Sequence, residues 1–344
     1  MQNGFRAALE VDEEAELIAR EHTTSAGMAV VLLLALAAAG LAQNKADSPA
    51  TTGHIEKAKT LAGKDWAKQE QFFCEMPVPN LPNDPLIEPV KLFDNVWALG
   101  SVSTTIYAIP TSQGIVLIDA GYPDQVDTIV LPQLKKAGID EAKITYVFLG
   151  HGHVDHYGAA KYLQDKYHTR IASTAADWDM MDPPADSGKK ARPDAPKCDM
   201  ILTDGEVIKL GDFPIRVVTI PGHTPGSVGY IFPVKDGEKR YMAGLYGGTV
   251  LLPRIAWNLD EYVKSLGKWA AESKKANVEV QLQNHPHMLD VPDKLDRLQS
   301  RKPGGPNPFV VGNAAYVRYF EMIQECTLAQ KQRLVESPPP PAKQ

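Results

Sequence analysis

The stretch ITYVFLGHGHVDHYGAAKYL, residues 144–163, decides the fold. It begins with a short apolar run that is typical of a buried β-strand and leads into helical spacing from about Tyr157 to Tyr167. Between the two, HGHVDH places three histidines and one aspartate within six positions. The chain has only nine histidines among its 344 residues. A concentration of this kind therefore needs a chemical explanation.

Metal binding is the explanation that this spacing favours. If the chain stays extended after the strand, side-chain alternation places His151 and His153 on one side, where two imidazole nitrogens can share an ion. The turn into the helix then directs Asp155 and His156 towards a second position. Compact groups of imidazole and carboxylate suit zinc, iron or manganese. The simpler alternative is that Asp155 caps the helix among surface histidines, but four ligand-type residues in HxHxDH spacing favour the metal.

Two further histidines also follow apolar, strand-like runs. His223 lies in VVTIPGHTPGSVGY, and His285 lies in VEVQLQNHPHMLD, where His287 is an alternative to it. Taken singly, such histidines are more often structural or exposed. Together with the cluster they give six candidate ligands, which divide naturally into three for each of two ions.

Strand-like and helix-like patterns follow one another in two successive blocks. Each block has short apolar runs first and a helical pattern later, and the last helix is predicted at about residues 313–335. This order favours an α/β (α+β) sandwich of two sheets with helices on the outer faces. A doubly wound nucleotide-binding fold is the competing architecture, but no GxGxxG or GxxxxGK motif follows a strand.

The ends of the chain differ in composition from its centre. Residues 1–42 contain the apolar run MAVVLLLALAAAGLA and are predicted to be a secretory signal, with a single N-terminal membrane anchor as the alternative. We therefore expect a periplasmic or secreted protein with no stable membrane span after processing. Residues 43–85 are predicted to form a surface arm, residues 86–335 the folded domain, and residues 336–344 a disordered tail.

Charge and cysteine content narrow the classes of partner. The formal net charge of −6 gives no basic excess that would neutralise phosphates, so we expect a small-molecule substrate and no nucleic acid; the oligomeric state is left open. The three cysteines Cys74, Cys198 and Cys326 form no CxxC pair and allow at most one disulfide. None lies beside the histidines, and we expect them to be buried as small apolar residues.

These motifs, in this order, resemble those of the metallo-β-lactamase-fold hydrolases. HxHxDH, PGHTPGS around His223, the late NHPH and the strand-ending GIVLIDAG carry the resemblance. EPVKLFDNVWALG and DEYVKSL, again with PGHTPGS, are most similar to the subclass B3 β-lactamases. The resemblance covers about residues 86–335 and implies a four-layer αβ/βα sandwich of two mixed sheets. It also implies two Zn²⁺ ions per chain, the first held by His151, His153 and His223 and the second by Asp155, His156 and His285.

One segment departs from the pattern of the wider family. Many members have an aspartate or a cysteine ligand after the strand that here reads YMAGLYGG, whereas this chain has Ala243, Gly244 and Leu245. The missing ligand fits subclass B3 and argues against the lactonase and glyoxalase II branches. Subclass B3 enzymes commonly have substrate-binding serines near this segment, where this chain has Gly244 and Tyr246.

The resemblance implies hydrolysis through a metal-bound hydroxide, with a β-lactam ring as the first candidate substrate. Asp155 and His153 would be catalytic, with Asp155 orienting the hydroxide. Asp119 is a candidate to orient a ligand, with a turn at the end of its strand as the alternative role. Tyr157 and Tyr246 are candidates to line the pocket, with simple packing as the alternative. The alternatives are a dizinc hydrolase of another ester, lactone or amide, and a metal-binding protein without turnover.

Overall fold

The computed structural model describes residues 47–75, 85–101, 103–183, 187, 194–248, 258–285 and 289–336. Internal contacts divide the chain into Met1–Ser48 and Pro49–Gln344, and every element below belongs to the second unit. The predicted signal, residues 1–42, and the tail beyond Glu336 lie outside the described residues. No described helix combines the length and the apolar character that crossing a bilayer requires.

Two mixed β-sheets form the centre of this unit. Within the described residues, the first sheet has seven strands in sequential order: β1 (Val90–Phe93), β2 (Val96–Gly100), β3 (Thr105–Thr111), β4 (Gly114–Ile118), β5 (Ile144–Phe148), β6 (Arg170–Ser173) and β7 (Met200–Ile201). The second has five, in the order β12 (Val278–Leu282), β11 (Lys239–Tyr246), β10 (Val228–Asp236), β9 (Phe213–Thr219) and β8 (Val207–Leu210). Pairing is parallel from β4 to β7 and between β11 and β12, and antiparallel elsewhere.

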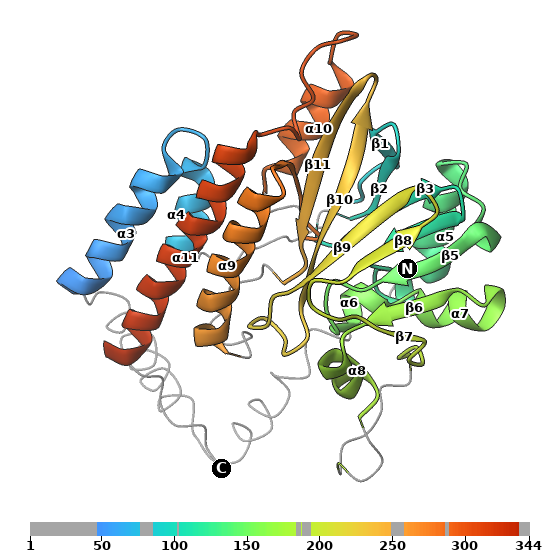
Figure 1. Ribbon diagram of the computed structural model, residues 1–344, viewed down its shortest axis with the longest axis horizontal. Coiled ribbons are helices and arrows are strands. Elements are labelled where there is room, and N and C mark those ends of the chain that lie inside the picture. The colour runs from blue at the N-terminus through green and yellow to red at the C-terminus, as the bar shows by residue number, and fades with distance from the viewer. Residues whose placement is uncertain are drawn as a thin grey trace, which may run out of the picture. The chain divides into compact units, whose positions relative to one another are not determined.

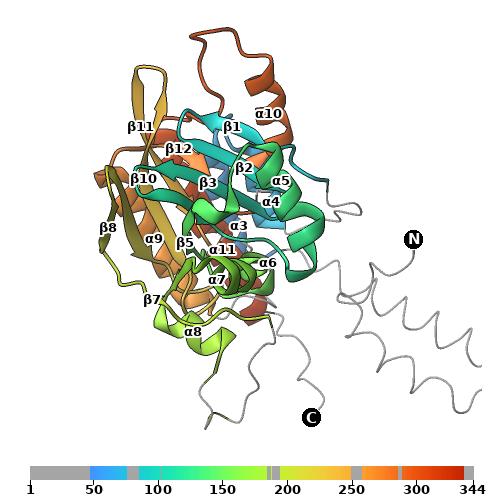
Figure 2. The same cartoon turned by 90° about the vertical axis from the view of Figure 1, so that its right-hand side faces the viewer.

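Helices cover the outer face of each sheet. The α-helices among the described residues are α3 (Pro49–Ala62), α4 (Ala67–Glu75), α5 (Leu131–Lys136), α6 (Val154–Tyr157), α7 (Ala160–Tyr167), α8 (Ala175–Met181), α9 (Leu259–Lys275), α10 (Val291–Gln299) and α11 (Asn313–Glu336). Short helical turns occur at Pro123–Gln125, Val126–Val130 and Glu141–Lys143. Figure 1 shows α9 and α11 beside the second sheet, α3 on the far side of α11, and α5 and α7 beside the first sheet, and Figure 2 shows the same elements from the side.

Strand alternation explains why both faces of each sheet are buried. Val147 of β5 points into an apolar cluster that includes Leu163 of α7, whereas the next residue, Phe148, points into a cluster that includes Tyr230 of the second sheet. A third cluster joins the far face of the second sheet to α9 and α11. The predicted sandwich of two mixed sheets with outer helices is confirmed.

The region expected to be a surface arm contains two helices. Helix α11 packs against both α3 and α4, and a disulfide joins Cys74 of α4 to Cys326 of α11. Phe73 and Trp66 are buried in the cluster that includes α11. The expectation that all three cysteines are buried is wrong for Cys198, whose thiol is free and exposed.

The helix predicted from Tyr157 to Tyr167 is divided in two. Helix α6 ends at Tyr157 and α7 begins at Ala160, because the backbone N–H groups of Gly158 and Ala159 donate to the loop after β4. A Cβ atom at Gly158 would lie 2.1 Å from the carbonyl carbon of Tyr122. The close approach of these two loops therefore requires glycine and interrupts the helix.

Candidate metal centre

The histidines come together because their segments follow three strand ends. His151 and His153 lie in the loop between β5 and α6, and His156 lies on α6 itself. His223 lies in the turn between β9 and β10, and His285 follows β12. The first sheet thus supplies one ligand-rich segment and the second sheet supplies two.

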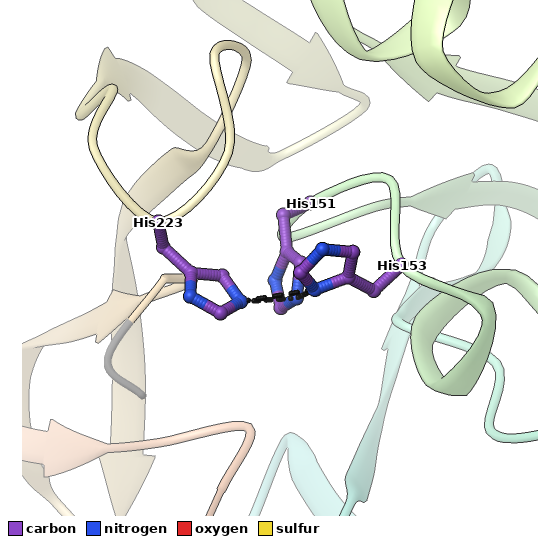
Figure 3. Close-up of side chains that lie close together, drawn as sticks. All are labelled: His151, His153 and His223. Atoms are coloured by element: carbon purple, nitrogen blue, oxygen red, sulfur yellow. Dashed lines mark hydrogen bonds between the residues drawn. The ribbon is translucent and has the colours of Figure 1, made fainter. Parts of the chain in front are cut away.

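Three imidazoles form the first cluster, which Figure 3 shows. The Nε2 atom of His151 lies 3.1 Å from Nδ1 of His153, and Nε2 of His223 lies 3.0 Å from each of these two nitrogens. His151 and His223 are buried, and His153 is partly exposed. One nitrogen of each ring therefore points at the same small volume.

A second cluster lies beside the first. The Nε2 atoms of His156 and His285 are 3.2 Å apart, and Oδ2 of Asp155 lies 3.1 Å from Nε2 of His156. His151 also brings a nitrogen to within 4.8 Å of His156 and His285, and so lies between the two clusters. The structure therefore brings all six candidate ligands together, with Asp155 beside His156.

Hydrogen bonds on the far side of three rings determine their tautomers. Nδ1 of His151 lies 2.5 Å from the Gly247 carbonyl oxygen, and Nδ1 of His285 lies 2.6 Å from that of Ser103. A carbonyl oxygen only accepts, so each Nδ1 carries the proton and each Nε2 carries a lone pair. Nδ1 of His156 likewise donates to Asp119 at 2.8 Å.

Converging lone pairs repel one another unless a cation lies between them. Zinc binds imidazole nitrogen at about 2.0–2.1 Å, so two nitrogens on one tetrahedral ion lie about 3.3 Å apart. The separations of 3.0–3.2 Å in the two clusters are close to this value. Imidazole and carboxylate donors without a thiolate also suit zinc. Both clusters therefore fit a bound metal ion.

Burial and neighbouring charges set the protonation states of these residues while no metal is bound. Burial lowers the pKa of His151, and the charge of nearby His156 adds to this effect, so the His151 ring is neutral. Burial also acts against a charge on His156, but Asp155 and Asp119 outweigh it and raise the pKa of His156 to about 10. Its Nε2 therefore carries a proton at neutral pH, which a bound metal ion would displace. Burial opposes ionisation of Asp155, yet the charge of His156 and its hydrogen bond hold the pKa of Asp155 far below its usual value. The second cluster thus contains the negatively charged carboxylate of Asp155.

Polar groups that the sequence did not single out support both clusters. Asn284 donates to Oδ2 of Asp119 at 3.1 Å and to the Gly247 carbonyl at 3.1 Å. The segment YMAGLYGG, which has no coordinating side chain, therefore still supports the first cluster. The backbone carbonyl of Gly247 in this segment orients His151. For Asn284, the only sequence feature that indicated such a role was its position directly before His285. The hydroxyl of Thr104 lies 3.4 Å from Asp155, and no sequence feature indicated this contact.

The two tyrosines expected to line the pocket are fully buried. The Tyr246 ring packs against Trp269 and Phe320 in the cluster below α9 and α11, and it therefore offers no surface to a substrate. Tyr157 is buried in the cluster that covers the outer face of the first sheet. His287, the alternative to His285, lies outside the described residues.

Comparison with known proteins agrees with the fold described above. Residues 98–236 match the family model described as the metallo-beta-lactamase superfamily. The chain contains a metallo-beta-lactamase superfamily domain. A curated relative, the hydroxyacylglutathione hydrolase of Rhodopseudomonas palustris (strain HaA2), is 32% identical over 123 residues. This match covers 36% of the chain and only 40% of that protein.

Solved structures of the same superfamily cover more of the chain. BJP-1, a subclass B3 metallo-beta-lactamase of Bradyrhizobium japonicum, is 25% identical with a TM-score of 0.62, over 74% of this chain and 98% of that one. The FEZ-1 metallo-beta-lactamase of Legionella gormanii is 21% identical with a TM-score of 0.61. This likeness covers 75% of this chain and 100% of the FEZ-1 chain. The second likeness shows the fold alone.

Proposed function

We propose that this chain is a zinc-dependent hydrolase that opens the β-lactam ring of antibiotics, in the manner of a subclass B3 β-lactamase. The observation that carries the proposal is the convergence of five imidazoles and one carboxylate, with one nitrogen of each ring pointing into one of two adjacent small volumes. The structural likeness to BJP-1 supports the choice of substrate. The substrate is a small molecule.

Each cluster would hold one ion. His151, His153 and His223 would hold the first, and Asp155, His156 and His285 the second. Bound zinc would supply hydroxide near neutral pH and would polarise the carbonyl group under attack. A bound cation would keep Asp155 ionised, so its carboxylate could accept a hydrogen bond from the attacking water and orient it. Asp119 would fix the ring of His156 through the bond to Nδ1.

A second candidate function is hydrolysis of another ester, thioester, lactone or amide by the same centre. The sequence match to the hydroxyacylglutathione hydrolase of Rhodopseudomonas palustris favours it, because that protein's name specifies a glutathione conjugate as substrate. Against it, no aspartate stands at Ala243, Gly244 or Leu245 to bridge the ions. A metal-binding protein without turnover is the third alternative.

Metal analysis combined with turnover assays separates these functions. The purified protein should contain zinc and should hydrolyse a penicillin, a chromogenic cephalosporin or a carbapenem in a reaction that a chelator abolishes. His153→Ala should lose this activity. The matched control is His168→Asn, since His168 is exposed and has a left-handed backbone that asparagine tolerates. Turnover of only a hydroxyacylglutathione thioester would select the second function, and equal turnover by wild type and His153→Ala would contradict the metal mechanism.

Export to the periplasm or the medium is part of the proposal. The disulfide between Cys74 and Cys326 supports it, because disulfides persist mainly in oxidising compartments. An N-terminal membrane anchor is the alternative. Cell fractionation and N-terminal sequencing of the mature protein distinguish the two, because an anchored chain stays with the membrane and keeps its apolar segment.

A further inference from the structure

Two separate loops carry the first cluster, and the first turn of α8 lies between them. One loop carries His151 and His153 on either side of Gly152, and the other carries His223 followed by Thr224 and Gly226. The three rings converge only if these loops keep a set distance. One side chain of α8, that of Asp177, contacts both of them.

Asp177 accepts one hydrogen bond from the first loop and two from the second. Its Oδ2 atom accepts from the N–H of Gly152 at 2.7 Å and from the Thr224 hydroxyl at 2.9 Å. Its Oδ1 atom accepts from the N–H of Gly226 at 2.9 Å. The Asp177 side chain is fully buried, so water does not compete for these donors. All three partners are donors, and only a carboxylate satisfies them with both oxygens.

Close packing reinforces this link. A Cβ atom at Gly152 would lie 2.7 Å from Cε of Met180, and one at Gly226 would lie 2.0 Å from the Thr174 hydroxyl and 2.6 Å from Cγ of Asp177. The Thr174 hydroxyl also donates to the Gly226 carbonyl at 2.8 Å. Both loops therefore lie directly against α8, with no room for a side chain in between.

We propose that Asp177 is a positioning residue, which holds His151 and His153 at the right distance from His223 and thereby sets the affinity of the first metal ion. Gly152 lies between His151 and His153 in the chain. Thr224 directly follows His223. A shift of either loop therefore moves the ligand nitrogens directly. The proposal rests on the proposed function in one respect, that the first cluster binds a metal ion.

Cobalt(II) titration in a single-cluster background tests the proposal without any substrate. His285→Ala disables the second cluster, so the remaining visible absorbance of bound Co²⁺ and competition with a chelator report the first. In this background, Asp177→Asn should weaken Co²⁺ binding by about 10- to 100-fold, the range for residues that orient metal ligands, because one carboxylate oxygen becomes an N–H₂ group that faces a donor. The matched control is Asp179→Asn on the same helix, since Asp179 is exposed; it should bind Co²⁺ as the parent does.

The opposite background tests whether the effect is local. His223→Ala disables the first cluster, and there Asp177→Asn should change the affinity of the second cluster by less than about twofold, because the bonds of Asp177 reach only the loops of the first cluster. A loss of equal size in both backgrounds would show general destabilisation and would overturn the positioning role. So would an Asp177→Asn variant that binds Co²⁺ as tightly as the His285→Ala parent. A parent that binds no Co²⁺ would instead refute the proposed function.

A second variant keeps the test valid if Asp177→Asn does not fold, as thermal unfolding would show. Thr224→Val keeps the shape of the side chain but removes the hydroxyl, and with it one of the three hydrogen bonds to Asp177 and the bond to the Ser227 hydroxyl. It should weaken Co²⁺ binding in the same direction by a smaller factor. Thr224→Ser keeps the hydroxyl and should restore the parent affinity. Equal affinities for Thr224→Val and Thr224→Ser would overturn the proposal.

Discussion

Asp119 accepts a hydrogen bond from the imidazole of His156, with Oδ2 of the carboxylate 2.8 Å from Nδ1 of the ring. The other oxygen accepts from the N–H of Gly150 at 2.6 Å. Asp119 has a left-handed backbone, with φ of 63°, and is fully buried. Left-handed backbone is uncommon outside glycine but is tolerated best by aspartate and asparagine. One carboxylate thus both turns the chain after β4 and orients a candidate metal ligand.

Asp119→Asn should weaken metal binding at the second cluster. The asparagine amide can accept with only one atom, so either His156 or Gly150 faces a donor where it needs an acceptor. We expect a loss of metal affinity of about 10- to 100-fold at this cluster, while the backbone conformation is retained. Competition titration with a chelator measures the affinity, with His223→Ala as the background that isolates the second cluster. Unchanged affinity in that background would contradict an orienting role for Asp119.

The sequence predicts the convergence of the histidines better than it predicts their support. HxHxDH and the later histidines each follow a strand-like run, and ligands at strand ends of neighbouring sheets meet at one edge. Asp177 gave no such signal, because an acidic residue in the first turn of a helix has the same appearance when it serves only the helix dipole. Its importance comes from three donors, two of which are backbone groups that sequence patterns do not reveal.

The predicted pocket role of Tyr246 shows a second limit. Strand β11 lies between β12 and β10 in the second sheet, and apolar clusters cover both of its faces, so its burial pattern shows no alternation between core and surface. Without alternation, the sequence does not tell which residues face the histidines. The two helices at 49–75 were missed for a different reason. Their stability comes from packing on α11, which is more than 200 residues away in the chain.

Gly247→Ala should destabilise the fold and the metal centre together. A Cβ atom at this position would lie 2.2 Å from the Val228 carbonyl oxygen and 2.7 Å from Cα of Gly150, and backbone atoms cannot rotate away. We expect the free energy of unfolding to fall by about 2 kcal/mol or more, and His151 to lose its acceptor. Denaturant unfolding measures the first effect and metal titration the second.

The control for this substitution is Gly53→Ala in α3. No atom lies within 4 Å of a Cβ there, and its backbone is helical, so alanine should stabilise the helix by about 0.5–1 kcal/mol. Equal effects of the two substitutions would refute the steric argument.

Reduction of the disulfide should lower stability without removing the metal centre. Cys74 and Cys326 are 252 residues apart in sequence, so the bond restricts nearly the whole unfolded domain. We expect Cys326→Ser to reduce the free energy of unfolding by about 2–5 kcal/mol, measured as a lower melting temperature, with zinc content unchanged. Cys198→Ser, which removes the exposed free thiol, should melt as the wild type does. A reductant should destabilise the wild type but not Cys326→Ser; equal shifts in both would argue against this linkage.

Lys294 should make stability rise with pH above neutrality. Its Nζ atom is buried, lies 5.7 Å from the centroid of the Trp66 ring and 5.6 Å from that of Phe309, and has no hydrogen-bond partner among the described residues. Burial, aided by the charge of Arg297, lowers the pKa of Lys294 to about 8 from its usual 10.5. Between these two values the unfolded state binds more protons than the folded state, so the free energy of unfolding increases as pH rises through this window.

The measurement compares wild type with Lys294→Met, which keeps most of the length of the side chain and its apolar stem and has no proton to lose. At pH 7 the buried charge makes the wild type the less stable of the two. From pH 7 to pH 10, the wild type should gain on the order of 2 kcal/mol relative to Lys294→Met in urea unfolding, since each pKa unit corresponds to about 1.4 kcal/mol. Taking the difference removes every other titrating group that the two proteins share. A difference that stays constant across this range would show that Lys294 has an ordinary pKa in the folded protein.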